Sequence, residues 1–400
     1  MKKAYIVSNN YCEEAKLETQ RLINIICKAS APSEYVYTNK IEDADLIVFY
    51  SCGHLQTTEA DSINTIKRIL SQKKASSELI VWGCLPKINP EAIRRVHSGP
   101  MVGPEDWAFF YKLFDQPEEI ADSVTANALS FGYGLPSANE RLPSRVRARF
   151  WRFLLYFDLK PKRIWYIRTE SGCVNSCTYC SDKLAYFCVR SQPIESIIQQ
   201  FGRGLRNGYK YFFFVGRDQG SYGCDIGLSL ADLLQAIHEK YPDQDYKLIL
   251  DHVSPNKLID LYPNLNSSIL FNNVCELGSH IQSGSDRILK LMGKNVKVYD
   301  WTRVIKTISR DYPQIRLQTS MIVGFPSESE QDFRQSINLV NNVLFDKIFV
   351  YTFNERPGLP ALRIKGRVPE KTKRKRERTM NYYATINMYR KRISRNLQRA

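Results

Sequence analysis

Short apolar runs alternate with longer amphipathic stretches along most of the 400-residue chain. An apolar run of four to eight residues is typical of a buried strand, whereas apolar residues that recur every three or four positions indicate a helix. In the first part of the chain this pattern predicts strands at 4–7, 46–50 and 79–82 and helices at 13–28 and 59–70. Alternating strands and helices favour a parallel sheet, so residues 1–131 are predicted to form a three-layer α/β domain.

The central part of the chain repeats this alternation six times. The predicted strands are 164–168, 211–215, 247–250, 274–278, 316–323 and 347–353, and the clearest helices are 194–205, 230–241, 299–312 and 330–344. Six such units predict a partial (β/α)6 barrel over residues 163–362, with its site at the carboxyl ends of the strands.

Two segments lie outside these domains. Residues 132–162 are rich in proline and predict a linker, in which arginines and aromatic residues interleave over 145–157. That pattern favours an amphipathic helix packed on the barrel, although it could also stack on bases or lie on a membrane surface. Residues 363–400 predict one basic helix, whose apolar residues recur at helical spacing: Tyr382, Ile386, Tyr389, Ile393 and Leu397.

The net charge of +16 is concentrated in this last segment. Residues 363–400 carry 14 lysines and arginines against Glu370 and Glu377, and the remaining 362 residues are close to neutral. A basic helix can follow the phosphates of RNA. An acidic peptide, or docking of the helix on the protein itself, would also explain the charge.

The composition indicates the compartment. No run of eighteen apolar residues is present, and the short apolar run at the N-terminus predicts a strand and no signal peptide. Ten cysteines without an export signal favour a reducing cytosol, where thiols stay free. We therefore expect a cytoplasmic monomer that does not associate with membranes.

Three cysteines in one short run, Cys173, Cys177 and Cys180, follow the first predicted barrel strand. Three thiolates on one loop can bind three irons of a [4Fe–4S] cluster and leave the fourth iron open. A structural zinc ion normally takes four protein ligands, and the next cysteine, Cys188, lies eight residues further on. The run predicts a cluster; a zinc site and three unliganded cysteines are the alternatives.

Three further cysteines, Cys12, Cys52 and Cys84, each follow a predicted strand of the N-terminal domain. Ligands gather beyond the carboxyl ends of the strands in open α/β sheets, so these cysteines could converge on one point. Three separate core cysteines are the alternative, because free cysteine is commonly buried.

The spacing of Cys173, Cys177 and Cys180 resembles the signature of radical S-adenosylmethionine (SAM) enzymes, and the aromatic Tyr179 fits it. From residue 1 to about residue 380 the chain resembles the methylthiotransferases of that superfamily. The sequences around Cys52 and Cys84, Tyr-Ser-Cys and Gly-Cys, are similar to the family's Asn-Thr-Cys and Gly-Cys-Leu. The chain also resembles further motifs of the family, in the same order, at residues 216–223, 280–285, 322–326 and 356–361. Within the first of these, 218–223 is closer to the ribosomal-protein branch than to the tRNA branch.

This resemblance implies an enzyme that converts C–H to C–S–CH3 on a macromolecular or peptide substrate, such as RNA, a ribosomal protein or a ribosomally made peptide. It implies two [4Fe–4S] clusters, two SAM molecules, and a reductant such as flavodoxin or ferredoxin. The first cluster would be bound by Cys173, Cys177 and Cys180, and the second by Cys12, Cys52 and Cys84. This chemistry demands no general base, and we assign no catalytic side chain.

The resemblance also implies contacts to SAM at the ends of the barrel strands. The candidate residues are Tyr179, Gly216, Gln219, Gln282, Ser283, Gly284, Ser285 and Gly324. Glycine lets the backbone approach a ligand closely, and the amide and hydroxyl side chains can hydrogen-bond a ribose or a carboxylate. For each residue, a strand-end turn without ligand contact is the alternative.

The chain departs from the family in two places that bear on function. Residues 181–187 lack the proline and the Arg-Gly segment that usually follow the last cysteine, and the 400 residues include no small C-terminal β-domain. The family uses that domain to hold its substrate, so the tail helix is expected to supply recognition. The alternatives are a radical SAM peptide-modifying enzyme without sulfur transfer, whose second cluster carries electrons, and a non-catalytic RNA-binding relative.

Overall fold

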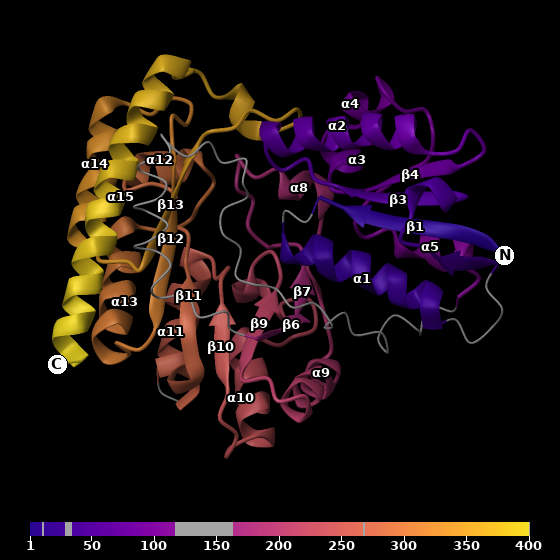
Figure 1. Ribbon diagram of the computed structural model, residues 1–400. Coiled ribbons are helices and arrows are strands. Elements are labelled where there is room, and N and C mark those ends of the chain that lie inside the picture. Colours follow the sequence, from indigo (N-terminus) through magenta and orange to yellow (C-terminus); the bar gives the residue numbers. More distant parts are fainter. Residues whose placement is uncertain (10–11, 29–33, 117–162, 267–268, 400) are drawn as a thin grey trace.

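Two parallel sheets with their helices, and one two-stranded antiparallel sheet, occur in the part of the chain that the structure describes (Figure 1). The structure is a computed structural model, and it describes residues 1–9, 12–28, 34–116, 163–266 and 269–399. The linker predicted at 132–162, including its arginine-aromatic segment, lies outside these residues.

The N-terminal domain has five parallel strands in the order β2-β1-β3-β4-β5. The strands are β1 (Lys2–Ser8), β2 (Tyr35–Tyr37), β3 (Leu46–Ser51), β4 (Glu78–Gly83) and β5 (Met101–Val102). The helices are α1 (Glu13–Lys28), α2 (Gln56–Gln72), α3 (Leu85–Ile88), α4 (Pro90–Arg94) and α5 (Trp107–Leu113). Helices α1 and α5 cover one face of the sheet, and α2, α3 and α4 cover the other (Figure 1). The predicted three-layer domain is therefore confirmed.

The alternation of side chains along β3 explains the two layers, because successive residues of a strand point to opposite faces. Val48 and Tyr50 pack against α1, whereas Ile47 and Phe49 pack against α2. All six residues of β3 are buried, as expected for the central strand of a sheet that is covered on both sides.

The second sheet contains the six strands that the pattern predicts, in the order β13-β12-β11-β10-β9-β6. They are β6 (Ile164–Arg168), β9 (Tyr211–Val215), β10 (Lys247–Leu250), β11 (Val274–Gly278), β12 (Arg316–Val323) and β13 (Lys347–Thr352). The helices are α9 (Ile194–Arg206), α10 (Leu230–Lys240), α11 (Pro255–Asn266), α12 (Asp286–Leu291), α13 (Val298–Asp311) and α14 (Glu330–Asn342). Every neighbouring pair is parallel, and the strands lie side by side in chain order, as in an open barrel.

The two faces of this six-stranded sheet have different neighbours. On the helix side Phe201 of α9 stacks on Phe212 of β9 with their ring centroids 3.9 Å apart, and both are fully buried. On the other face Tyr166 and Phe213 pack with Leu17, which belongs to α1 of the N-terminal domain. Helix α1 therefore lies against the inner face of the open barrel, and the N-terminal domain adjoins the barrel strands.

Helix α15 (Glu370–Arg399) lies along β13 and α14 (Figure 1). Much of its charge is used within the protein: Arg376 donates to Glu328 at 2.8 Å, and the Arg395 guanidinium lies 3.0 Å from Asp346. Of the alternatives for the basic tail, the structure shows docking on the protein itself. Five basic residues in the described part of the helix are exposed: Lys371, Arg374, Lys375, Arg378 and Arg390. No helix among the described residues is long and apolar enough to cross a membrane.

Candidate functional site

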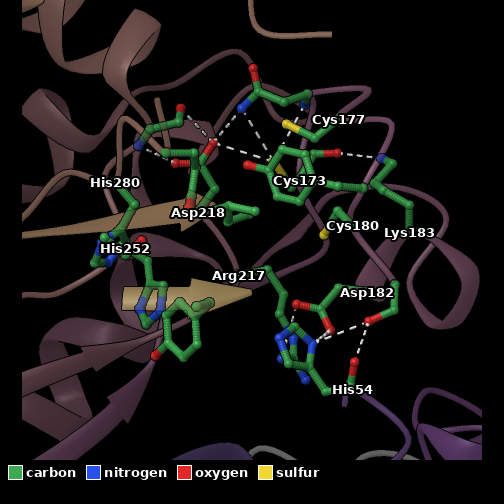
Figure 2. Close-up of a pocket in the computed structure, with 18 of the residues that line it drawn as sticks. His54, Cys173, Cys177, Cys180, Asp182, Lys183, Arg217, Asp218, His252 and His280 are labelled. Carbon is green, nitrogen blue, oxygen red and sulfur yellow. Dashed lines mark hydrogen bonds and ion pairs between the residues drawn. The ribbon is translucent and has the colours of Figure 1, made fainter. Parts of the chain in front are cut away.

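The first cysteine run forms a loop at the carboxyl end of β6. It follows the short strand β7 (Glu170–Ser171), which pairs with β8 (Arg190–Ser191). Gly172 has a φ of +76°, and a Cβ atom on it would lie 1.9 Å from the carbonyl oxygen of Cys188. Only glycine fits this turn, because other residues combine backbone strain with a steric clash there. The turn directs Cys173, Cys177 and Cys180 into a cavity of about 360 Å³ (Figure 2).

Polar neighbours hold this cysteine loop in place. The buried carboxylate of Asp218 accepts from the Asn175 side chain at 3.0 Å and from the Ser221 hydroxyl at 2.6 Å, and the Cys173 thiol lies 3.4 Å from it. Lys183 donates to the carbonyl oxygen of Cys173 at 2.7 Å. These bonds tie the loop to the end of β9, since Asp218 follows that strand.

Burial favours the protonated form of two thiols of this loop, Cys173 and Cys180, in the absence of metal. Burial, reinforced by the Asp218 carboxylate, raises the pKa of Cys173 to about 12, and burial also raises that of Cys180. A metal ligand must be a thiolate, so cluster binding would release these protons. Among the described residues, no three His, Cys, Asp or Glu side chains are close enough to hold a single metal ion. A four-iron cluster is wider than one ion, and the zinc alternative has no support from the geometry.

The second set of cysteines also comes together. Cys12, Cys52 and Cys84 follow β1, β3 and β4, whose carboxyl ends share one edge of the N-terminal sheet. Burial raises the pKa of Cys12 well above its usual value, and the charges of Cys52 and Cys84 add to this, so the three thiols lie within electrostatic reach of one another. Burial likewise raises the pKa of Cys84 to about 12. The three cysteines therefore follow strands that end at one edge of the sheet, and their binding of a second cluster stays a prediction.

Two of the candidate SAM contacts line the cavity, namely Tyr179 and Gln282. Gln282 has a φ of +76°, is held by backbone hydrogen bonds to Ser320 and Ile322, and has a side-chain oxygen that is buried without a hydrogen-bond partner among the described residues. A buried acceptor without a partner is unfavourable unless a ligand satisfies it. Gln282 therefore suits a polar ligand in this cavity.

Gly216 and Gln219 do not line the cavity. A neighbouring side chain fills the space at Gly216, and backbone groups of the fold bind the side chain of Gln219. A Cβ atom on Gly216 would overlap the Glu170 carboxylate, so this glycine makes room for Glu170. The Gln219 side chain donates to the Phe214 carbonyl at 2.7 Å and accepts from the His252 backbone at 2.6 Å. Both ends of its amide are satisfied within the fold, which corrects the predicted contact to SAM.

Ser283, Gly284 and Ser285 likewise have structural partners. The Ser285 hydroxyl donates to Asp332 at 2.6 Å and caps α12, and the backbone N–H of Gly284 donates to Ser336 at 2.9 Å. The Ser283 hydroxyl lies 3.4 Å from that of Ser336. These three residues join α12 to α14 and do not line the cavity, so for them the alternative of a turn without ligand contact holds.

Gly324, like the five candidates above, packs against neighbouring residues and does not make the predicted cofactor contact. Its φ of +74° lets the chain turn after β12, and its N–H donates to Glu328 at 2.6 Å. A Cβ atom here would lie 2.4 Å from the Lys373 side chain. Gly324 therefore admits the first turn of α15 beside the end of the barrel strand.

Sequence reasoning missed a charged network between the two cysteine sets. Arg217, directly after β9, lies between Glu14 of α1 and Asp182 of α8 (Asp182–Ala185), and Figure 2 shows it pointing toward Asp182. Burial alone would raise the pKa of Asp182, but Arg217 and then His54 hold it well below its usual value. The available signal was the arginine in the motif 216–223, together with the unusual segment 181–187.

The cavity wall opposite the cysteines carries imidazoles and aromatic rings. His252 and His280 have ring centroids 5.3 Å apart, and Phe349 and Tyr351 of β13 stack with an interplanar angle of 11°. Burial lowers the pKa of His280 to about 4, so this ring is neutral at physiological pH. The wall offers flat surfaces and neutral polar groups, which suit an organic substrate or cofactor.

Comparison with known proteins agrees with this geometry. The Radical SAM superfamily profile matches residues 167–340, and that of the Uncharacterized protein family UPF0004 matches residues 5–102. A threonylcarbamoyladenosine tRNA methylthiotransferase, MtaB from Thermotoga maritima, is 29% identical over 375 residues, covering 90% of this chain and 80% of the relative. The ribosomal protein uS12 methylthiotransferase RimO from Thermotoga sp. is 29% identical over 354 residues, covering 87% and 76%. The chain belongs to the radical SAM methylthiotransferase family.

Among solved structures, the radical SAM methyltransferase TsrM from Kitasatospora setae has the same fold, with a TM-score of 0.61 at 10% identity, covering 90% of this chain and 75% of that one. As a methylthiotransferase, the protein is an enzyme, so the non-catalytic alternative is wrong, and the relatives do not favour peptide modification without sulfur transfer. The family's cofactors are [4Fe–4S] and SAM. The residues present fit them, because three thiols and the unpaired Gln282 oxygen share one cavity.

Proposed function

We propose that this methylthiotransferase converts a C–H bond to C–S–CH3 in a macromolecular substrate, with a [4Fe–4S] cluster on each of its two cysteine sets and two SAM molecules per turnover. One observation carries the proposal. Arg217 connects two sets of three cysteines from two different sheets: it lines the cavity of Cys173, Cys177 and Cys180 and lies 3.9 Å from Cys84 of the second set.

At the first set, Cys173, Cys177 and Cys180 would hold the cluster, and the cavity beside them would hold SAM. When bound, these groups supply the one-electron chemistry that removes a hydrogen atom from the substrate, and the second cluster supplies the sulfur. Asp218 and Lys183 keep the loop in one conformation. The unpaired oxygen of Gln282 offers SAM an acceptor.

At the second set, Cys84 is buried, whereas Cys12 and Cys52 are half-buried. Cys84 is 5% exposed, and it packs with Ile88 of α3 and with Ala185 and Tyr186, which covers the set from the barrel side. The backbone N–H of Cys52 donates to Ser62 at 3.0 Å, which fixes the turn after β3. We infer that this enclosure protects a reactive sulfur until the substrate arrives.

The substrate class follows from the relatives. The relatives named above act on tRNA or on the ribosomal protein uS12, which supports a macromolecular substrate and a cytoplasmic location. Exposed Lys371, Lys375 and Arg378 of α15 stay candidates for contacting it. The reductant, of the flavodoxin or ferredoxin class, and the monomeric state stay predictions.

The proposal is tested by counting iron and sulfide after anaerobic reconstitution. Wild type should hold about eight irons, the content of two four-iron clusters. The Cys12→Ala/Cys52→Ala/Cys84→Ala variant and the Cys173→Ala/Cys177→Ala/Cys180→Ala variant should each hold about four. Cys27→Ala, an exposed cysteine of α1, is the matched control and should keep about eight.

Activity separates the roles of the two sets. Loss of the first set should abolish reductive cleavage of SAM, whereas loss of the second set should preserve that cleavage and abolish incorporation of a methylthio group into tRNA or ribosomal protein, followed by mass spectrometry. About four irons in wild type, with no change when Cys12, Cys52 and Cys84 are replaced, would contradict the two-cluster proposal.

A further inference from the structure

Arg217 is the cation that lies nearest the second cysteine set among the contacts the structure describes. Its side chain is 16% exposed, forms an ion pair with Glu14, and lies 3.5 Å from Asp182. It donates to the Tyr186 hydroxyl at 2.8 Å, and its guanidinium lies 4.3 Å from the centre of that ring. Four contacts from α1, α8 and Tyr186 thus hold one guanidinium in a single orientation.

This guanidinium lies beside the second cysteine set. A terminal nitrogen of Arg217 lies 3.9 Å from the sulfur of Cys84, within hydrogen-bonding range for sulfur. Cys12 and Cys52 follow strands that end at the same sheet edge as the strand before Cys84, so the charge of Arg217 lies at the edge where this set is placed. A positive charge that favours three thiolates also favours added negative charge on a group that those thiolates hold.

The polar groups around Arg217 do not fully satisfy its charge and its hydrogen-bond donors. Glu14 also pairs with Arg168, so Arg217 does not have that carboxylate to itself. The Nε atom of Arg217 is buried and has no hydrogen-bond partner among the described residues. A buried donor that lacks a partner is costly, and such groups cluster at functional sites.

We propose that Arg217 is a positioning residue that raises the reduction potential of the second cluster, an inference that rests on the proposed two-cluster function. Hydrogen bonds and positive charge beside cluster sulfurs favour the reduced state. The reaction needs this property. If the cluster held a thiolate sulfur, attack by a carbon radical would use two of the three electrons involved for the new C–S bond, break the sulfur–iron bond and leave one electron for the cluster to accept.

The test measures the potential of the second cluster by itself. In the Cys173→Ala/Cys177→Ala/Cys180→Ala background, the reconstituted protein is titrated with dithionite and redox mediators, and the reduced cluster is followed by electron paramagnetic resonance. At the wild-type midpoint potential, Arg217→Gln and Arg217→Met should each lower the ratio of reduced to oxidised cluster about tenfold, which is ~59 mV for a one-electron couple. Arg217→Lys, which keeps the charge but loses the fork, should fall between.

Arg168→Met is the matched control. Arg168 has the same 16% exposure and shares Glu14, and its ion pairs in the described residues are with Glu14 and Glu18. Its potential should stay at the wild-type value. An unchanged potential in Arg217→Gln, or an equal shift in Arg168→Met, would overturn the inference. If Arg217→Met does not retain its iron, the potentials of Arg217→Gln and Arg217→Lys decide whether the inference holds. If no cluster forms with Arg217 intact, the two-cluster function fails as well.

Discussion

Glu59 of α2 and Arg356, which follows β13, join the two domains by an ion pair whose partners are unequally buried. The Arg356 side chain is 2% exposed, whereas that of Glu59 is 19% exposed and also accepts from the Asn89 amide at 3.0 Å. Methionine matches the length of glutamate and is two atoms shorter than arginine, and replacing either partner by it strands the other charge. We predict that the two replacements differ in cost, because the two stranded charges differ in burial.

The magnitudes follow from that asymmetry. Glu59→Met leaves a guanidinium buried without its carboxylate, and losing one partner of a buried pair costs about 3–5 kcal/mol. Arg356→Met leaves a carboxylate that reaches water and keeps Asn89, so about 1–2 kcal/mol is expected. The double variant should be more stable than Glu59→Met, because it leaves no stranded charge.

Hydrogen exchange is the suitable assay, because a two-domain protein need not unfold in one step. The free energy of local opening is measured for peptides that cover α2 and residues 354–359. Asp245→Asn, which breaks an exposed pair with Lys210, is the control and should change exchange little. Equal losses for Glu59→Met and Arg356→Met, or a double variant less stable than both, would refute the reasoning.

Three further predictions concern the barrel. Burial raises the pKa of Glu170 to about 8 from 4.5. The contribution of Glu170 to stability is therefore full below about pH 4.5 and is lost by up to ~1.4 kcal/mol per pH unit as the pH rises toward 8. Glu170→Gln should flatten this pH dependence in thermal unfolding of the apoprotein, and an unchanged slope would contradict the prediction. Phe201→Ala should destabilise the barrel by about 3–5 kcal/mol in urea unfolding, because the ring is fully buried. Gly172→Ala should reduce the iron content after reconstitution, because the added Cβ atom would clash with the carbonyl group of Cys188. Gly208→Ala is the control: its φ is +74° and no atom lies within 4 Å of the added Cβ, so it has the same backbone strain without the clash and should retain its iron.

The fold was largely predictable because its elements are encoded locally. Six barrel strands were predicted from apolar runs, and each lies within a residue of its predicted bounds. Short or less apolar elements escaped this reasoning, such as β5, with two residues, and α8, with four. Their sequences carry too few turns or alternations to produce a periodic signal.

The assignments to SAM were less predictable for a physical reason. Ser285 and Gln219 carry groups that could bind a cofactor, but Asp332 and the backbone of residues 214 and 252 satisfy them. A buried polar group takes whichever partner the fold brings near, and Asp332 lies 47 residues away from Ser285 in the chain. Local sequence does not contain that information.

The sequence by itself determined which chemistry is available, because the cysteine spacing and the strand periodicity are local properties of the chain. It placed three thiols on one loop and three more at the ends of separate strands. Only the tertiary structure decided that Arg217 lies 3.9 Å from Cys84, that α15 pairs much of its charge within the protein, and that the Gln282 side-chain oxygen has no hydrogen-bond partner in the described part of the chain. Those outcomes depend on how segments far apart in sequence approach one another, and burial then dictates which charges and hydrogen bonds must be paired.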